Sequence, residues 1–149
     1  MIAKWRRLDW SKRLVLLEAA CYLAAAHFAV HILPFRWLAS RLGNLGEPSS
    51  EIQISQEQQR QAQQVGWAVT SLARYYPSDA KCLAQAVSGK WMLQRRSLPS
   101  TLFLGVERVH SGEKWLEAHA WLRCGTDIIT GEQHHERFKV LAAFTEEQL

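Results

Sequence analysis

The stretch Pro77-Ser-Asp-Ala-Lys-Cys-Leu-Ala-Gln-Ala86 opens a segment whose apolar residues recur at helical spacing. The helix is predicted to begin at Ser78 or Asp79, because either side chain can accept a hydrogen bond from the first turn, and to run to about Arg96. Cys82 then lies in that turn, where unpaired N–H groups and the helix dipole favour a thiolate and can hold an oxyanion. Free cysteines are also common core residues, so Cys82 needs a partner to indicate chemistry.

The chain before this stretch is predicted to be helical. A long helix over residues 11–33 has Ser11 as its N-cap and is stopped by Pro34. A short helix over 35–42 follows. Residues 43–50 are rich in Gly, Asn, Ser and Pro, which is typical of a linker.

A third helix is predicted from Ser55 to about Tyr75. Ser55 and Gln58 have the spacing of a capping box, and apolar residues at helical spacing follow them. Together with the linker, this divides the chain into an N-terminal helical segment, 1–46, and a second domain, 47–149.

The second half of the chain is predicted to be a small antiparallel sheet. Strands are expected over 101–109 and 117–123, with a turn at 124–127 and another strand beginning at Ile128. Residues 138–144 form a last strand or a short helix. Helices followed by an antiparallel meander indicate the α+β class.

The composition fits one globular domain, or one domain with a helical extension. The chain has 149 residues, 48% hydrophobic and 21% charged, with a net charge of +4. These values exclude a disordered chain. Three cysteines are too few for a disulfide scaffold, and their number is odd, so we expect free thiols and a cytoplasmic protein.

The basic excess lies at the N-terminus. Between Met1 and Gly43 the acids are Asp9 and Glu18, against these basic residues: Lys4, Arg6, Arg7, Lys12, Arg13, Arg36 and Arg41. Residues 19–35 carry no charge, a length at the lower edge of a membrane span. We predict a helix that packs on the second domain or docks a partner or an anionic membrane. A solvated helix face and a membrane anchor are the alternatives.

His119 is the partner that Cys82 requires. It lies in Ala118-His-Ala-Trp121, on a predicted strand within an apolar run. A histidine there is more often a core residue. A cysteine at a helix start with a histidine on a later strand, however, is the arrangement of thiol proteases and acyltransferases, in which the imidazole moves the thiol proton.

A third group should orient the imidazole. If the turn centres on Gly125-Thr126, His119 faces Glu132 across the hairpin, and side chains directly opposite lie about 5 Å apart at Cβ. Glu132 is therefore the predicted orienting residue, with Thr130 as the next choice.

Two other assignments follow from the same geometry. Asp127 lies in the turn, roughly 16 Å along the strand from His119 at ~3.3 Å per residue, which is too far. A turn of different length by one residue would replace Glu132 by Gly131 or Gln133.

The remaining histidines and cysteines carry no specific motif. His27 and His31 have i, i+4 spacing but no third ligand nearby, so we predict no metal site. The adjacent His134-His135 pair is expected in a loop. Cys21 and Cys124 have no Cys-x-x-Cys partner and are expected to be bystanders.

Several short motifs occur in a characteristic order from about Tyr75 to Phe144. The chain resembles the leader-peptidase part of the lasso peptide biosynthesis B proteins, a branch of the transglutaminase-like cysteine protease superfamily. The N-terminal helix, ending in Leu33-Pro-Phe-Arg36, is also similar to that family. The motifs are Cys82-Leu-Ala-Gln-Ala86, Leu93-Gln-Arg-Arg-Ser-Leu-Pro99, Leu102-Phe-Leu-Gly-Val106, Leu116-Glu-Ala-His-Ala-Trp-Leu-Arg-Cys-Gly125, Ile129-Thr-Gly131 and Phe138-Lys-Val-Leu141.

The resemblance implies a papain/transglutaminase-like core and a peptidase that removes the leader of a ribosomally made precursor peptide. It implies three protein partners: the precursor, a separate leader-recognition protein, and an ATP-dependent cyclase that closes the macrolactam ring. It implies neither a cofactor nor a nucleic-acid partner.

The resemblance also assigns Cys82 as nucleophile and His119 as base. The family's usual acid would fall at Thr130 or Gly131, neither of which is acidic. A Cys–His dyad assisted by Glu132 or by a backbone carbonyl remains open. The alternatives are a transamidase or amidase acting on another peptide, and a non-catalytic scaffold.

Overall fold

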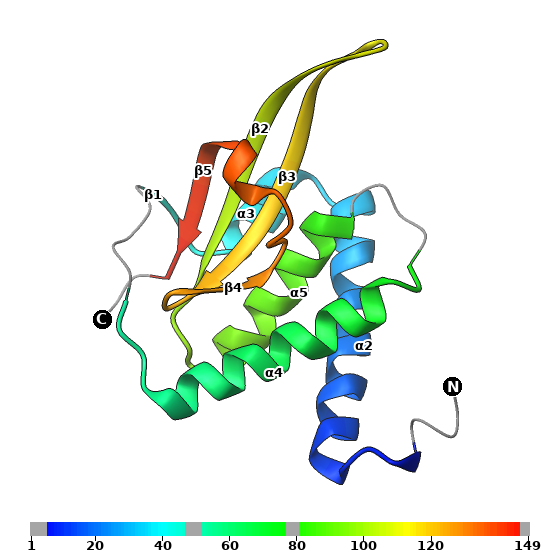
Figure 1. Cartoon of the computed structure of the whole chain (residues 1–149), viewed down its shortest axis with the longest axis vertical. Helices are drawn as coiled ribbons and strands as arrows, with labels where there is room; N and C mark the ends of the chain where they lie inside the picture. Colours follow the sequence, from blue (N-terminus) through cyan, green and yellow to red (C-terminus); the bar gives the residue numbers. More distant parts are fainter. Residues whose placement is uncertain (1–5, 47–51, 77–80, 147–149) are drawn as a thin grey trace.

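The computed structural model describes residues 6–46, 52–76 and 81–146, and its helices pack on one antiparallel sheet (Figure 1). The predicted α+β class is confirmed. The helices are α2 (Trp10–Ile32), α3 (Phe35–Arg41), α4 (Gln56–Ala73) and α5 (Lys81–Arg95), with a 3-10 turn, η1 (His135–Arg137). The strands are β1 (Asn44–Gly46), β2 (Thr101–Ser111), β3 (Lys114–Cys124), β4 (Asp127–Thr130) and β5 (Lys139–Thr145).

The sheet has the strand order β1-β5-β2-β3-β4, with every pair antiparallel. Residues 138–144, predicted as strand or helix, lie almost entirely in β5. The linker prediction for 43–50 is wrong at Asn44–Gly46, because this segment pairs with β5 as an edge strand. Residues 47–50 lie outside the described part of the chain.

The β2–β3 hairpin is longer than predicted and projects beyond the helices (Figure 1). Its strands meet at the pair Ser111–Lys114, whereas the sequence predicted strand ends at 109 and 117. The first five residues of β3 are all exposed, so they lack the inside–outside alternation by which a strand is recognised.

One hydrophobic core joins the helices to the sheet. α5 packs against β3, and α2 packs against both α5 and α4. Leu23 of α2, Val69 of α4, Leu93 of α5 and Leu122 of β3 are each at most 2% exposed and belong to one cluster. The described part of the segment 1–46 therefore shares its core with the domain predicted over 47–149.

Helix ends follow local capping chemistry. Ser55 and Gln58 form the predicted capping box at the start of α4. The Ser11 prediction is wrong by two residues: Asp9 caps α2 by accepting the Trp10 N–H, and the Ser11 hydroxyl donates to the same carboxylate. The proposed cap of α5, Ser78 or Asp79, lies outside the described residues.

Glu18 ties α2 to the end of α5. Its carboxylate accepts both guanidinium nitrogens of Arg96, at 2.8 and 2.6 Å, and also one from Arg95 at 3.3 Å. The hydrogen bonds from Arg96, opposed in part by burial, lower the pKa of Glu18 below 4.5. The charge that interrupts the apolar run of α2 is thus used to fix the helix on the domain.

Replacing Glu18 by glutamine should lower the free energy of unfolding by about 1–2 kcal/mol at pH 7, because it removes a paired, largely buried carboxylate. When folding lowers the pKa of a carboxyl group, that group contributes its full stabilisation of the fold at pH values above its pKa in the unfolded chain. The stabilisation is lost as the pH falls through its pKa in the folded protein. The difference between wild type and Glu18→Gln should therefore be constant above pH 4.5 and shrink below it. Urea unfolding at pH 7, 5 and 3.5 measures this; a constant difference at all three would contradict it.

Candidate active site

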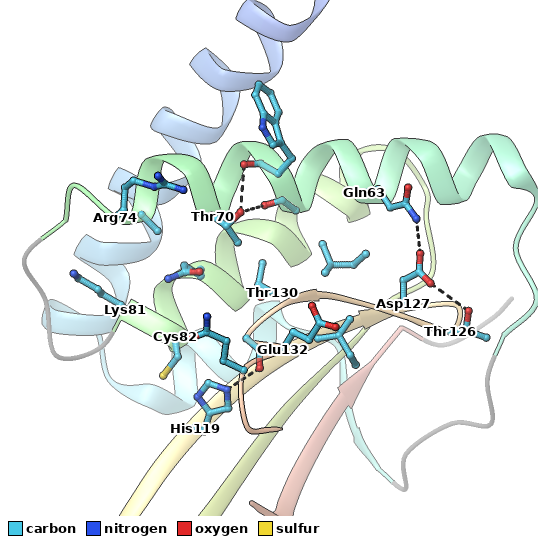
Figure 2. Close-up of a pocket in the computed structure, with 18 residues that line it drawn as sticks. Gln63, Thr70, Arg74, Lys81, Cys82, His119, Thr126, Asp127, Thr130 and Glu132 are labelled. Atoms are coloured by element: carbon cyan, nitrogen blue, oxygen red, sulfur yellow. Dashed lines mark hydrogen bonds between the residues drawn. The ribbon is translucent and has the colours of Figure 1, made fainter. Parts of the chain in front are cut away.

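Cys82 and His119 line the same cavity, of about 950 Å³, between α4, the start of α5 and the β3–β4 end of the sheet (Figure 2). Residues 126–133, from the turn, β4 and the loop after it, form much of the opposite wall. The fold thus brings together two residues that are 37 positions apart in the sequence.

Cys82 is the second residue of α5 as described, and it is half-buried. In the view of Figure 2 its sulfur points toward the His119 imidazole. It lies on the first described turn of α5, and the predicted helix start at Ser78 or Asp79 lies outside the described residues.

His119 projects from β3 and is held by a backbone oxygen. Its Nε2 lies 2.8 Å from the carbonyl oxygen of Gly131. A carbonyl can only accept, so Nε2 must carry the hydrogen, and in the neutral ring Nδ1 is then the free acceptor. Hydrogen bonding to the main chain thereby fixes the tautomer that a general base needs.

Two aromatic rings pack against the imidazole of His119. The His119 ring lies 4.9 Å from that of Phe138 and 5.9 Å from that of Trp121, centroid to centroid. Gly105, which pairs with His119 across β2 and β3, makes this possible: a Cβ there would lie 2.9 Å from both Phe138 and the Trp121 ring.

Residue 131 must be a glycine for two reasons: its backbone conformation and its close packing against β3. Its φ is +76°, and a Cβ there would lie 2.5 Å from the Ala120 oxygen and 2.9 Å from Trp121 Cβ. The loop after β4 can therefore bring its carbonyl against His119 only because this residue has no side chain.

The predicted hairpin register is correct at the turn and wrong beyond it. Cys124 pairs with Asp127 and Arg123 with Ile128, as expected for a turn at Gly125-Thr126, but Leu122 then pairs with Thr130. The extra residue in β4, a bulge, shifts the later pairing by one position. The predicted pairing of His119 with Glu132 is therefore wrong.

The group that meets the imidazole comes from the loop after β4, which ends at Thr130. Glu132 lines the cavity but is exposed, and the bond to His119 Nε2 is made by the Gly131 carbonyl. The Thr130 hydroxyl is buried and has no hydrogen-bond partner among the described residues. Of the options left open by the sequence, the backbone carbonyl is the one in contact.

Asp127 does not orient His119, as its distance along the strand predicted. It contacts α4 instead. Its carboxylate accepts the side-chain amides of Gln59 at 3.0 Å and Gln63 at 2.8 Å, both on α4. These hydrogen bonds, Gln59 first, lower the pKa of Asp127. The acid thus fastens the β3–β4 turn to α4.

Several of the residues that line the cavity were not identified from the sequence. Gln85 lies one turn after Cys82, and its i, i+3 spacing could have placed it on the same helix face. The contribution of α4 has no local signal, because it depends on how that helix crosses the sheet. Its lining residues include Gln63, Trp67, Thr70 and Arg74.

The other cysteines and histidines lie outside the cavity lining. Cys124 is 1% exposed, and burial raises the pKa of its thiol to about 11, whereas Cys21 is exposed on α2. His31 Nδ1 bonds the His27 carbonyl oxygen. Across residues 6–46, 52–76 and 81–146, no group of three or more His, Cys, Asp or Glu is arranged to hold a metal ion.

A cysteine near the start of a helix and a histidine on an antiparallel strand, lining one cavity, are the arrangement typical of thiol-dependent proteins. The chain belongs to the transglutaminase-like superfamily, whose family model matches residues 29–143. This superfamily includes cysteine proteases and transamidases. No curated protein and no solved structure matches the chain.

Proposed function

We propose that this protein is a cysteine peptidase that removes the leader from a ribosomally made lasso precursor peptide. The observation that carries the proposal is the His119–Gly131 hydrogen bond beside Cys82 in one cavity, because it leaves His119 Nδ1 free as a base. The ordered motifs from Cys82 to Leu141 point to the same family branch.

In the first half of the reaction, His119 Nδ1 accepts the Cys82 proton while the sulfur attacks the carbonyl carbon of the leader–core amide. In this mechanism, N–H groups of the first turn of α5 donate to the oxyanion. The tetrahedral intermediate collapses as Nδ1–H protonates the departing amine. The core leaves with a free N-terminus, and the leader remains as a thioester on Cys82.

In the second half, the neutral imidazole takes a proton from water as the water oxygen attacks the thioester carbonyl. Breaking the C–S bond releases the leader as a carboxylic acid and restores the thiol. We further propose that a separate recognition protein presents the leader and that an ATP-dependent cyclase consumes the freed core.

Product masses test the proposal. A precursor encoded beside this chain's gene is incubated with the wild-type protein and the recognition protein, and the products are measured by mass spectrometry. Hydrolysis should give two fragments whose masses sum to that of the precursor plus one water. An intact precursor in the presence of folded protein would contradict the peptidase proposal and favour a scaffold.

The same experiment separates hydrolysis from transamidation, since both pass through the thioester. Glycine methyl ester is added in excess. Peptidase activity should still give the leader acid as the main product. A leader fragment carrying the added amine as the main product would assign the protein to transamidation instead.

A further inference from the structure

One face of α2 is apolar and faces outward along the whole helix. Its large side chains are 51–68% exposed, and Cys21, Ala24 and Ala25 between them are exposed as well. Successive members lie three or four residues apart and so form a single stripe. We call it the outer face of α2; its large side chains are Trp10, Leu14, Leu17, Phe28 and Ile32.

The opposite face of α2 is locked into the protein. Leu16, Ala19, Leu23 and Ala26 are at most 6% exposed and belong to the core shared with α4 and α5. Among the described helices, α2 is the one long and apolar enough to cross a membrane by length and composition. Crossing would strip this face from the core, so a helix packed in this way can meet a membrane only by lying along its surface.

The charges around α2 are arranged for an anionic partner. Between Leu14 and Phe28 the one charged residue is Glu18, which is turned from the outer face and paired with Arg95 and Arg96. Exposed cations lie before the helix, at Arg6 and Arg7, and after it, at Arg36 and Arg41. An apolar stripe with basic ends matches a lipid surface, where side chains enter the acyl boundary and cations meet phosphates.

We propose that the outer face of α2 docks on an anionic lipid surface, with the helix lying in the plane of the interface. The occupant is the lipid bilayer itself, because the large exposed side chains of the stripe are all apolar and the exposed charges that flank the helix are four arginines against the single acid Asp9. The peptidase cavity is formed by α4, α5 and the sheet, so docking leaves Cys82 and His119 unchanged.

Vesicle co-sedimentation tests the proposal with the full chain. Vesicles of phosphatidylcholine alone are compared with vesicles containing phosphatidylglycerol, at low salt. The wild-type protein should bind the anionic vesicles at least about tenfold more tightly than the neutral ones. The triple variant Leu14→Gln, Leu17→Gln, Phe28→Gln should lose at least about tenfold of this binding, because it removes apolar contact and keeps every cation.

A matched control removes exposed apolar side chains elsewhere. Trp115→Gln with Leu141→Gln, at positions 84% and 66% exposed on the sheet, should bind like wild type. Circular dichroism and cleavage by Cys82 check that each variant is folded. The proposal is overturned if wild type binds no vesicles, if it binds both kinds equally, if the triple variant binds unchanged, or if the outer-face substitutions instead disperse a dimer of the chain.

Discussion

Replacing Cys82 by alanine should abolish precursor cleavage, with kcat/KM reduced by about three orders of magnitude or more. The substitution removes the sulfur that forms the thioester and leaves the rest of the cavity in place. Cys82 is half-buried at the start of α5, so a smaller side chain there should cause little loss of stability. Fragment release followed by mass spectrometry measures the effect.

Cys21→Ala is the matched control, because Cys21 is an exposed cysteine on α2 that lies outside the cavity lining. It should cleave at the wild-type rate. In that background iodoacetamide should label Cys82 and spare Cys124, whose burial raises its pKa to about 11. Cleavage that survives Cys82→Ala would disprove the mechanism.

Replacing Gly131 by alanine should reduce kcat/KM by about a hundredfold, because a displacement of about 1 Å in a catalytic group has an effect of that size. The new Cβ would meet the Ala120 oxygen at 2.5 Å, in a backbone conformation with φ +76°. The loop must shift, and the carbonyl that holds His119 Nε2 shifts with it. Thermal unfolding of the variant shows whether the domain is intact.

Glu132→Gln is the control for this variant, and it should retain most of the activity. The tautomer of His119 is a readout that loss of stability alone would not change. By ¹⁵N NMR, the wild type and Glu132→Gln should carry the hydrogen on Nε2, whereas Gly131→Ala should show a mixture of the Nε2–H and Nδ1–H tautomers. If Glu132→Gln lost activity and Gly131→Ala kept it, the carboxylate would be the orienting group.

Features set by neighbouring residues were predictable from the sequence. The Ser55–Gln58 box starts α4, and Gly125-Thr126 makes the β3–β4 turn. The pairing of a helix-start cysteine with a strand histidine also followed from local patterns, and the cavity contains both residues.

Features set by distant contacts were not predictable. Asn44–Gly46 looks like a linker, and it becomes β1 only because β5, about a hundred positions later, offers a free edge. The bulge in β4 likewise has no local sequence signal: Gly66 of α4 approaches so closely that a Cβ there would lie 2.6 Å from the Ile129 oxygen. A tertiary contact thus accompanies the shift that removes Glu132 from its predicted place opposite His119.

A main-chain oxygen at this position has an electrostatic consequence. A carboxylate partner would gain a proton in acid and would form an ion pair with the imidazolium that arises during catalysis. The Gly131 carbonyl does not ionise, so it can accept a hydrogen bond from Nε2–H whether the imidazole is neutral or charged. The positive charge on His119 then meets a peptide dipole and the faces of Phe138 and Trp121, whose attraction for a cation depends on ring quadrupoles. Dissolved salt weakens interactions between charged groups, and the Gly131 carbonyl carries no net charge. In the proposed mechanism, the group that orients the base is thus a neutral main-chain dipole, and dissolved salt has no ion pair at His119 Nε2 to screen.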